Sequence, residues 1–201
     1  MPRRTQAAVA QTRAAVTRAA VDRASVEGLE GLTIGGLAGE VEMRKSSLFS
    51  LFGSKEELQL ATLEAAVEHF KREVWEPVAD RDHGLERLLA LCDSWLAYHE
   101  REAMPGGCFL TTATVEYDAR PGALRDAVAR TMELWLAILE REAATAIESG
   151  ELPAGADAAD VAFELNALAA AASYGFQLRR DPQVFARARR SMRRALGVAP
   201  A

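Results

Sequence analysis

The chain has 201 residues, of which 49% are hydrophobic and 26% are charged, and its formal net charge at pH 7 is −5. That apolar content supports a sizeable core in one or two domains. No apolar run approaches the roughly 18 residues of a membrane span, and the basic N-terminus lacks the apolar segment of a secretory signal. We therefore expect a cytoplasmic protein that makes no membrane contact. The negative net charge argues against a general nucleic-acid binder.

The charge is unevenly distributed along the chain. Residues 1–55 carry eight basic and five acidic side chains, a net charge of +3, which leaves −8 for residues 56–201. A basic end on an acidic body directs only that end towards DNA.

Abundant alanine and scarce internal proline favour an all-α fold, and a first helix is predicted over about residues 6–26. Gly28 follows it as a stop signal. Leu29 and Leu32 would then complete a small core with the apolar stripe of this helix, which comprises Val9, Val16, Ala20 and Ala24.

Two short helices are predicted next. The first is capped by Thr33, and its apolar residues recur at the spacing of one helix face: Ile34, Leu37, Ala38 and Val41. The second continues this apolar surface with Met43, Leu48, Phe49 and Phe52. Its polar side chains are basic or hydroxyl-bearing, which is the chemistry that meets phosphates and base edges in a major groove.

Gly53 can end the second short helix, and Ser54 with Glu57 reads as a capping box that opens a long helix to about residue 76. Pro77 would end or kink that helix. Further helices are predicted over about residues 85–103, 108–117, 121–149, 157–179 and 182–196. By length alone 108–117 could be a strand, but no partner strand is predicted. Small residues in the middle of 157–179 favour close helix packing.

The capped short helix, the tight turn, the second short helix ending in L-F-x-x-F and the run G-S-K-E-E-L together resemble the DNA-binding region of the tetracycline-repressor (TetR) family of transcriptional regulators. The resemblance implies an N-terminal three-helix, helix-turn-helix DNA-binding domain over residues 1–53. A helical ligand-binding and dimerisation domain over residues 54–201 would follow. It also implies a homodimer, in which residues 157–196 of two chains form a four-helix bundle.

Three positions depart from the family pattern. Glu42 stands in the turn between the short helices, where the family usually has glycine, and Arg44 replaces a small capping residue. Leu51 stands where the family usually has histidine. A glutamate at a position that needs positive φ is strained, and it sets a negative charge near DNA. These departures leave open a homodimeric small-molecule-binding or partner-binding protein with a degenerate DNA-binding head.

A dimer of this kind would place two copies of the second short helix about one DNA turn apart and read a palindromic operator in double-stranded DNA. Arg44 and Lys45 are candidates for guanine or phosphate, and Phe49 for a thymine methyl group or for packing. The hydroxyl groups of Ser46, Ser47 and Ser50 are candidates for base edges or phosphate. Thr33 and Lys55 are candidates for backbone phosphates at two helix N-termini.

Aromatic side chains recur in the predicted body and could surround a small-molecule pocket. The candidates are Phe70, Trp75, Trp95, Tyr98, Phe109, Tyr117, Trp135 and Tyr174, with Phe176 close by in sequence. By resemblance, the protein is a repressor that a small apolar effector releases from DNA. The effector must then bind more tightly to a conformation in which the distance between the two DNA-binding helices of the dimer no longer matches the operator.

The sequence offers little for catalysis. His99 lies seven residues after Cys92 and could form a thiol–imidazole pair on one helix face. No glycine-rich phosphate cradle or metal-ligand spacing accompanies them, so we expect no enzyme activity, no metal and no cofactor. Cys92 and Cys108 are expected to be buried, small apolar residues.

Overall fold

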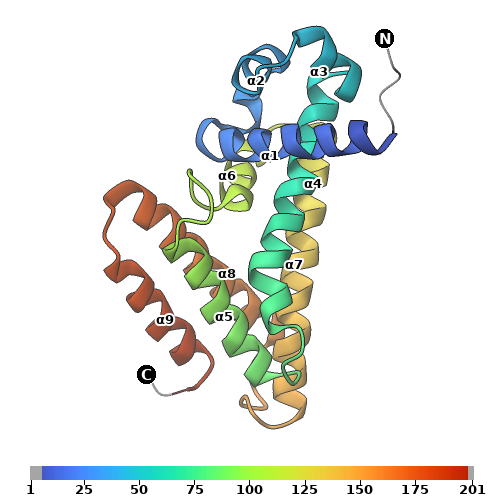
Figure 1. Cartoon of the computed structure of the whole chain (residues 1–201). Coiled ribbons are helices and arrows are strands. Elements are labelled where there is room, and N and C mark those ends of the chain that lie inside the picture. Colours follow the sequence, from blue (N-terminus) through green and yellow to red (C-terminus); the bar gives the residue numbers. More distant parts are fainter. Residues whose placement is uncertain (1–5, 199–201) are drawn as a thin grey trace. The chain divides into compact units, whose positions relative to one another are not determined.

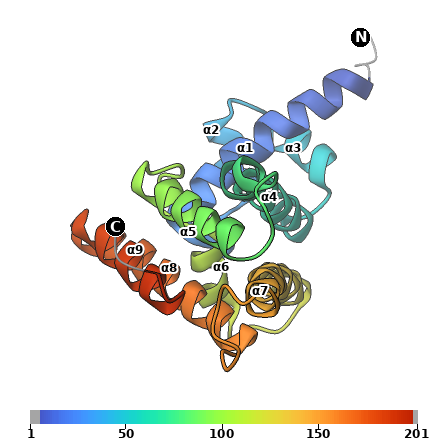
Figure 2. The ribbon, with the colours of Figure 1, turned by 90° about the horizontal axis from the view of Figure 1, so that it is seen from below.

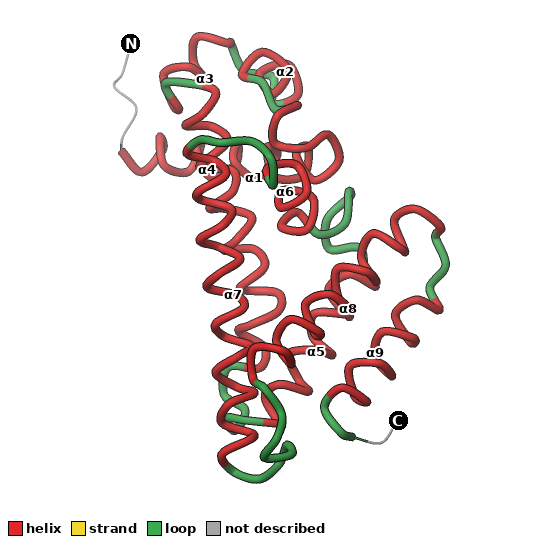
Figure 3. The backbone as a smooth tube through the Cα atoms, turned by 180° about the vertical axis from the view of Figure 1, so that it is seen from behind, coloured by secondary structure: helices red, strands yellow, loops and turns green. Residues whose placement is uncertain are grey.

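A computed structural model describes residues 6–198, and these residues form helices and loops with no strand (Figures 1 and 3). The all-α prediction is confirmed over this range. The chain divides into two compact units: a first unit of Met1–Glu68 with Met104–Val128, and a second unit of His69–Ala103 with Ala129–Ala201. The division of function at residue 53 stays a prediction. No helix in the described range is long and apolar enough to cross a membrane.

The first unit opens with three helices, α1 (Gln6–Gly31), α2 (Ile34–Glu40) and α3 (Lys45–Phe52), and the start of α4 (Lys55–Phe70) follows. Neither short helix can bury enough surface alone, so both pack on α1 and α4. Their shared core consists of Val16, Ala20, Leu32, Ile34, Leu37, Ala38, Leu48, Phe52, Leu58 and Ala61. The predicted helix-turn-helix arrangement is therefore present.

The predicted caps and stops lie where the sequence places them. The Thr33 hydroxyl accepts a hydrogen bond from the Gly36 amide at 3.1 Å, and the Ser54 hydroxyl accepts one from the Glu57 amide at 3.0 Å. Gly28 has φ 78° and breaks the helical path of α1, after which one further turn reaches Gly31. Side-chain capping of free amides fixes where α2 and α4 begin.

The segment around α6 (Phe109–Tyr117) packs against α1 within the first unit. The segment 108–117 is a helix, as predicted. Just before it the chain approaches α1 so closely that a Cβ on Gly106 would lie 1.8 Å from the carbonyl oxygen of Ser25. The Gly106 amide donates to the Ser25 hydroxyl at 3.0 Å, so glycine is required by contact rather than by its φ angle.

The helix predicted to reach residue 76 changes character before its end. After Phe70 the chain forms a π-helical turn over Lys71–Trp75 and a 3₁₀ turn over Glu76–Val78. Pro77 has no amide hydrogen, and its ring would collide with the carbonyl of Glu73 in a regular α-helix. The freed carbonyls find partners in the second unit, where the Ser94 hydroxyl donates to the Val74 oxygen at 3.0 Å.

The second unit is built from α5 (Leu85–Glu100), most of α7 (Ala123–Glu148), α8 (Ala158–Arg179) and α9 (Gln183–Ala195). Helices α8 and α9 form an antiparallel pair, and α5 packs against both (Figures 1 and 2). Asp157, directly before α8, caps this helix by accepting hydrogen bonds from the amides of Ala159 and Asp160. At Gly175, among the small residues of α8, an added Cβ would lie in ordinary van der Waals contact with Val184, at 3.5 Å.

Candidate functional site

The outer surface of α3 is polar and open. Leu48 and Phe52 are 0% and 5% exposed in the core of the first unit, and this burial turns the opposite helix face outward. That face carries Lys45, Ser46, Phe49 and Ser50, with Arg44 directly before it, and all five are exposed. Within residues 6–198 neither Arg44 nor Lys45 forms an ion pair. Both cations are therefore available to an anionic partner.

The start of α3 has no side-chain cap. Arg44 occupies the capping position, and its side chain makes no capping hydrogen bond. The first amides of the helix thus lack the hydroxyl or carboxylate that usually covers them. Such amides, together with the positive end of the helix dipole, can receive a phosphate oxygen.

The turn between α2 and α3 requires a left-handed residue, and that residue is Glu42. Its φ is 52°, and the following Met43 amide closes the turn by donating to the Ala38 carbonyl at 2.9 Å. A side chain with a Cβ is strained in this conformation, whereas glycine is not. The departure noted in the sequence therefore lies at a position with positive φ.

Three of the residues predicted to meet DNA have partners inside the first unit. Lys55 donates to the carbonyl and the carboxylate of Glu30, both at 2.8 Å. The Ser50 hydroxyl donates to the Ser46 carbonyl, and the Thr33 hydroxyl is occupied by its capping bond. A phosphate would have to share or replace these bonds. Within the part of the chain that the structure describes, the side chains of Arg44, Lys45, Ser46 and the half-buried Ser47 form no hydrogen bond or ion pair.

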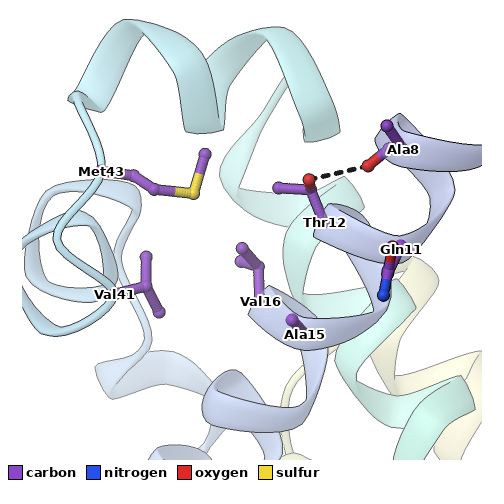
Figure 4. A pocket seen from close by; sticks show the side chains of 7 residues that line it. All are labelled: Ala8, Gln11, Thr12, Ala15, Val16, Val41 and Met43. Atoms are coloured by element: carbon purple, nitrogen blue, oxygen red, sulfur yellow. Dashed lines mark hydrogen bonds between the residues drawn. The ribbon is translucent and has the colours of Figure 1, made fainter. Parts of the chain in front are cut away.

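A groove of about 470 Å³ lies between α1 and the α2–α3 turn. Val41 and Met43 on the turn face α1 across it, and Thr12 donates to the Ala8 carbonyl at its edge (Figure 4). Its wall is aliphatic apart from Gln11 and Thr12. None of the aromatic residues predicted to line an effector pocket belongs to it.

The second unit gathers four of those aromatic residues into one cluster. Trp95 and Trp135 have ring centroids 4.9 Å apart, and the Phe70 ring lies 5.0 Å from that of Trp135. Tyr98 lies 5.6 Å from Phe70, and His99 joins the cluster 5.3 Å from Tyr98. The pairs between Trp95, Trp135 and Phe70 are T-shaped, as aromatic quadrupoles favour.

The other four predicted pocket residues lie elsewhere. Trp75 is half-buried in the π-helical turn, 5.8 Å from the Arg87 guanidinium. Phe109 and Tyr117 belong to the first unit, where the Tyr117 hydroxyl donates to Glu30 at 3.4 Å. Tyr174 is 55% exposed on α8. A spacing pattern cannot tell an inward aromatic residue from one that faces another surface.

The aromatic cluster contains polar atoms without partners. The indole nitrogens of Trp95 and Trp135 and both ring nitrogens of His99 are buried, and they make no hydrogen bond within the described residues. Burial lowers the pKa of His99 to about 4, so its imidazole is neutral at pH 7. His99 follows Trp95 by four residues, a spacing that places both side chains on one face of α5.

The ionic groups buried in the second unit neutralise each other. The Glu142 carboxylate is fully buried, and it accepts from Arg141 at 2.8 Å and from the Gly84 amide at 3.2 Å. Arg87 lies 3.5 Å from it, and His83 lies 3.1 Å away. Burial alone raises the pKa of Glu142, but the hydrogen bonds from Arg141, Gly84 and His83 outweigh burial and hold the pKa below its usual value.

Residues 84–192 match the model of the tetracyclin repressor-like C-terminal domain. This range spans more than half of the chain. The chain belongs to the TetR family. As a TetR-family protein it is a ligand-responsive, DNA-binding transcriptional regulator. No curated protein matches the sequence.

Solved structures of similar fold span nearly the whole TetR-family chain. A TetR transcriptional regulator from Chloroflexus aurantiacus J-10-FL superposes with a TM-score of 0.87 at 23% identity, covering 95% of this chain and 96% of that one. A TetR-family regulator from Cytophaga hutchinsonii has a TM-score of 0.84 at 22% identity, with coverage of 98% and 100%. AibR, solved with isovaleryl coenzyme A and operator DNA, has a TM-score of 0.73 at 19% identity, with coverage of 94% and 98%.

Proposed function

We propose that this TetR-family protein is a homodimeric repressor that binds a palindromic operator through α3 and leaves it when a small molecule binds. The observation that carries the proposal is the outer face of α3, where Arg44 and Lys45 are exposed and without ion pairs in residues 6–198. The fold is shared with AibR, which was solved with operator DNA and a small molecule. A regulator that acts on DNA would work in the cytoplasm.

The exposed side chains of α3 are proposed to make two kinds of contact with DNA, to backbone phosphates and to base edges. Arg44 and Lys45 would meet phosphate or guanine, and Ser46 and Ser47 would meet base edges or phosphate. Phe49 is 57% exposed, which favours contact with a thymine methyl group over packing in the chain's own core. Thr33, Ser50 and Lys55 would contribute only by sharing their present partners. The free amides at the start of α3 add a phosphate contact.

Dimerisation is proposed through α8 and α9, within residues 157–196. Phe163, Tyr174 and Leu178 are 72%, 55% and 81% exposed, and their spacing puts them on one face of α8. Large apolar side chains that share one open face mark an interaction surface. A two-fold dimer would bury this stripe against its own copy.

The effector is proposed to bind in the second unit, around Phe70, Trp95, Tyr98 and Trp135. Of the eight aromatic residues predicted for this role, these four are supported by mutual ring contacts. The effector can release the protein from DNA only if it binds more tightly to the conformation that does not bind DNA than to the conformation that does. We assign no catalytic role, because burial raises the pKa of the Cys92 thiol to about 12 and leaves no thiolate for a pair with His99.

The test is a titration of the purified protein against duplex fragments of its own upstream DNA, at two salt concentrations with competitor DNA present. We expect tight binding of two chains to one fragment. The double variant Arg44→Ala/Lys45→Ala should weaken binding and lower the salt slope by about 1 to 2 per subunit. The matched control Lys71→Ala/Arg130→Ala removes the same charge from exposed positions in the second unit and should leave the slope unchanged.

Two outcomes would contradict the proposal. If no fragment is preferred, α3 does not bind an operator, and the strained, negatively charged turn at Glu42 is the expected reason. The favoured function is then that of a dimeric protein that binds a small molecule or a partner protein. If a fragment is preferred but the Arg44→Ala/Lys45→Ala variant binds like the wild type, α3 is not the reading helix.

A further inference from the structure

Among the described residues of the second unit, two tryptophans and one histidine of the aromatic cluster have four buried ring nitrogens without hydrogen bonds. They are Nε1 of Trp95, Nε1 of Trp135, and Nδ1 and Nε2 of His99. The three side chains are 4%, 7% and 4% exposed. Buried polar groups in folded proteins nearly always find a partner, so several orphaned atoms in one place call for an explanation. A bound molecule would supply the missing partners.

These rings lie close together in the second unit. Trp95 and His99 are one turn apart on α5, with ring centroids separated by 6.3 Å. Trp135 comes from α7 and lies 4.9 Å from Trp95 at an interplanar angle of 85°. Phe70 lies within 6.0 Å of both tryptophans. The cluster therefore combines aromatic rings from α4, α5 and α7 with ring nitrogens from α5 and α7.

The hydrogen-bonding character of the cluster is biased towards donors. An indole nitrogen can only donate, and a neutral imidazole donates from one nitrogen and accepts at the other. Because the pKa of His99 is lowered by burial, the imidazole carries no charge to attract an anion. A matching molecule needs hydrogen-bond acceptors more than donors.

The charges around the cluster do not suit an ionic molecule. Of the side chains buried in the second unit's described residues, Arg87 and Glu142 are the charged ones, and they lie 3.5 Å apart in one ion cluster. Arg101 is exposed, with its guanidinium 5.9 Å from the Tyr98 ring. An ionised group brought into the aromatic cluster would lose water without gaining a buried counter-charge.

We propose that Trp95, Trp135 and His99 form the specificity site of the effector, which is an uncharged aromatic or conjugated molecule whose carbonyl-type oxygen accepts hydrogen bonds from these rings. Phe70 and the two indole rings supply the apolar contact, and His99 can also accept from a hydroxyl on the same molecule. The inference rests on the proposed function, because it specifies the chemistry of the effector site of the second unit.

The experiment compares three naphthalene probes of one size by equilibrium dialysis and calorimetry, with no DNA present. The probes are 2-acetylnaphthalene with a neutral acceptor, 2-ethylnaphthalene without one, and 2-naphthoate with a charge. We expect the ketone to bind at least about fivefold more tightly than each of the other two, because only the ketone satisfies the orphaned donors without burying an ion. Equal affinities, a preference for the carboxylate, or no binding of any probe would overturn the inference.

Variants of the cluster then test whether these rings cause the preference for the ketone over the ethyl probe. Trp135→Phe keeps an aromatic ring but removes the N–H, and His99→Phe removes both imidazole nitrogens; each should reduce the ratio between ketone and ethyl probes. Trp75→Phe is the matched control, since this indole lies outside the cluster, and it should keep the wild-type ratio. If the ratio survives in both cluster variants, the rings are ordinary core and the inference is wrong.

The outcome is separable from that of the proposed function. Operator binding is measured on the same protein without probe, and probe binding is measured without operator. Loss of operator binding with an intact preference for the ketone contradicts the repressor proposal alone. Operator binding without any preference among the probes contradicts this inference alone.

Discussion

Glu116 on α6 holds the amide of Leu29 at 2.8 Å, directly after the left-handed Gly28 at which the path of α1 breaks. The other carboxylate oxygen of Glu116 accepts from the Glu30 amide, also at 2.8 Å. One side chain thus satisfies two backbone donors that the break in α1 would leave free. The residues are 87 positions apart, so this bond ties α6 to α1 within the first unit.

Replacing Glu116 with glutamine tests how much its two hydrogen bonds to α1 stabilise the protein. The amide keeps one acceptor oxygen but turns an NH₂ group towards the second backbone donor, so we expect a loss of about 1–2 kcal/mol in the free energy of unfolding. Urea denaturation followed by circular dichroism measures it. Glu133→Gln, at an exposed position on α7, is the control and should change stability by less than about 0.5 kcal/mol. Equal effects of the two variants would mean that the Glu116 bonds contribute nothing.

Replacing Glu42 with glycine should improve two properties at once. Glycine relieves the positive φ at this turn, which should raise the free energy of unfolding by about 0.5–1 kcal/mol. It also removes a negative charge next to the proposed reading helix, so operator affinity should rise several-fold at low salt. Thermal unfolding and DNA titration measure the two effects.

The matched control for Glu42→Gly is Glu102→Gly. Glu102 also has a positive φ, of 50°, but lies in the second unit and pairs with Arg180 at 2.7 Å. It should relieve similar backbone strain while leaving operator affinity unchanged. An unchanged affinity in both variants would argue that the Glu42 charge does not face DNA.

The exposed stripe on α8 predicts the behaviour of the protein in solution. Introducing a carboxylate by Phe163→Asp or Leu178→Asp would place charge in the proposed two-fold interface, where each substitution occurs twice. Light scattering at micromolar concentration should report a dimer for the wild type and a monomer for either variant. Val115→Asp changes an equally exposed apolar residue on α6 and should remain dimeric. A monomeric wild type would refute the interface.

His99 makes the stability of the protein depend on pH. Its pKa is about 4 in the folded chain and 6.5 in the unfolded one, so the unfolded state binds the proton first as the pH falls. The stabilisation is therefore complete above pH 6.5 and is lost as the pH falls from 6.5 to 4. The loss has an upper limit of about 3 kcal/mol. In His99→Leu this part of the pH dependence should disappear from urea denaturation curves, and an unchanged curve would contradict the burial of a neutral imidazole.

Local sequence signals were enough to predict where most of the helices lie. Thr33 and Ser54 cap α2 and α4 as expected, because a cap acts through amides two or three residues away. The helix-turn-helix and its core followed from apolar spacing, and Cys92 and Cys108 are buried as expected. The π-helical turn before Pro77 was not predicted. Proline signals that a helix cannot continue regularly, but not how the preceding turns adapt.

The candidate sites followed from sequence only in part. The composition of α3 indicated which side chains could meet DNA, whereas the bonds between Lys55 and Glu30 depend on a contact across 25 residues. The aromatic residues were visible as a set, yet Tyr174 is exposed and Phe109 belongs to the other unit. Neither outcome could be read from helical spacing, which gives a face without saying what that face meets.

The positions of most helices, the caps at Thr33 and Ser54, the polar face of α3 and the family resemblance could be inferred from sequence, because each depends on residues within about one or two helical turns. Two features became visible only in the folded chain: Glu116 accepts hydrogen bonds from backbone amides at the break in α1, and Trp95, His99 and Trp135 bring together buried nitrogens without partners. Those features arise where helices distant in sequence meet. Their free energy depends on burial and on which partners are left over, and neither quantity has a local signature in the chain.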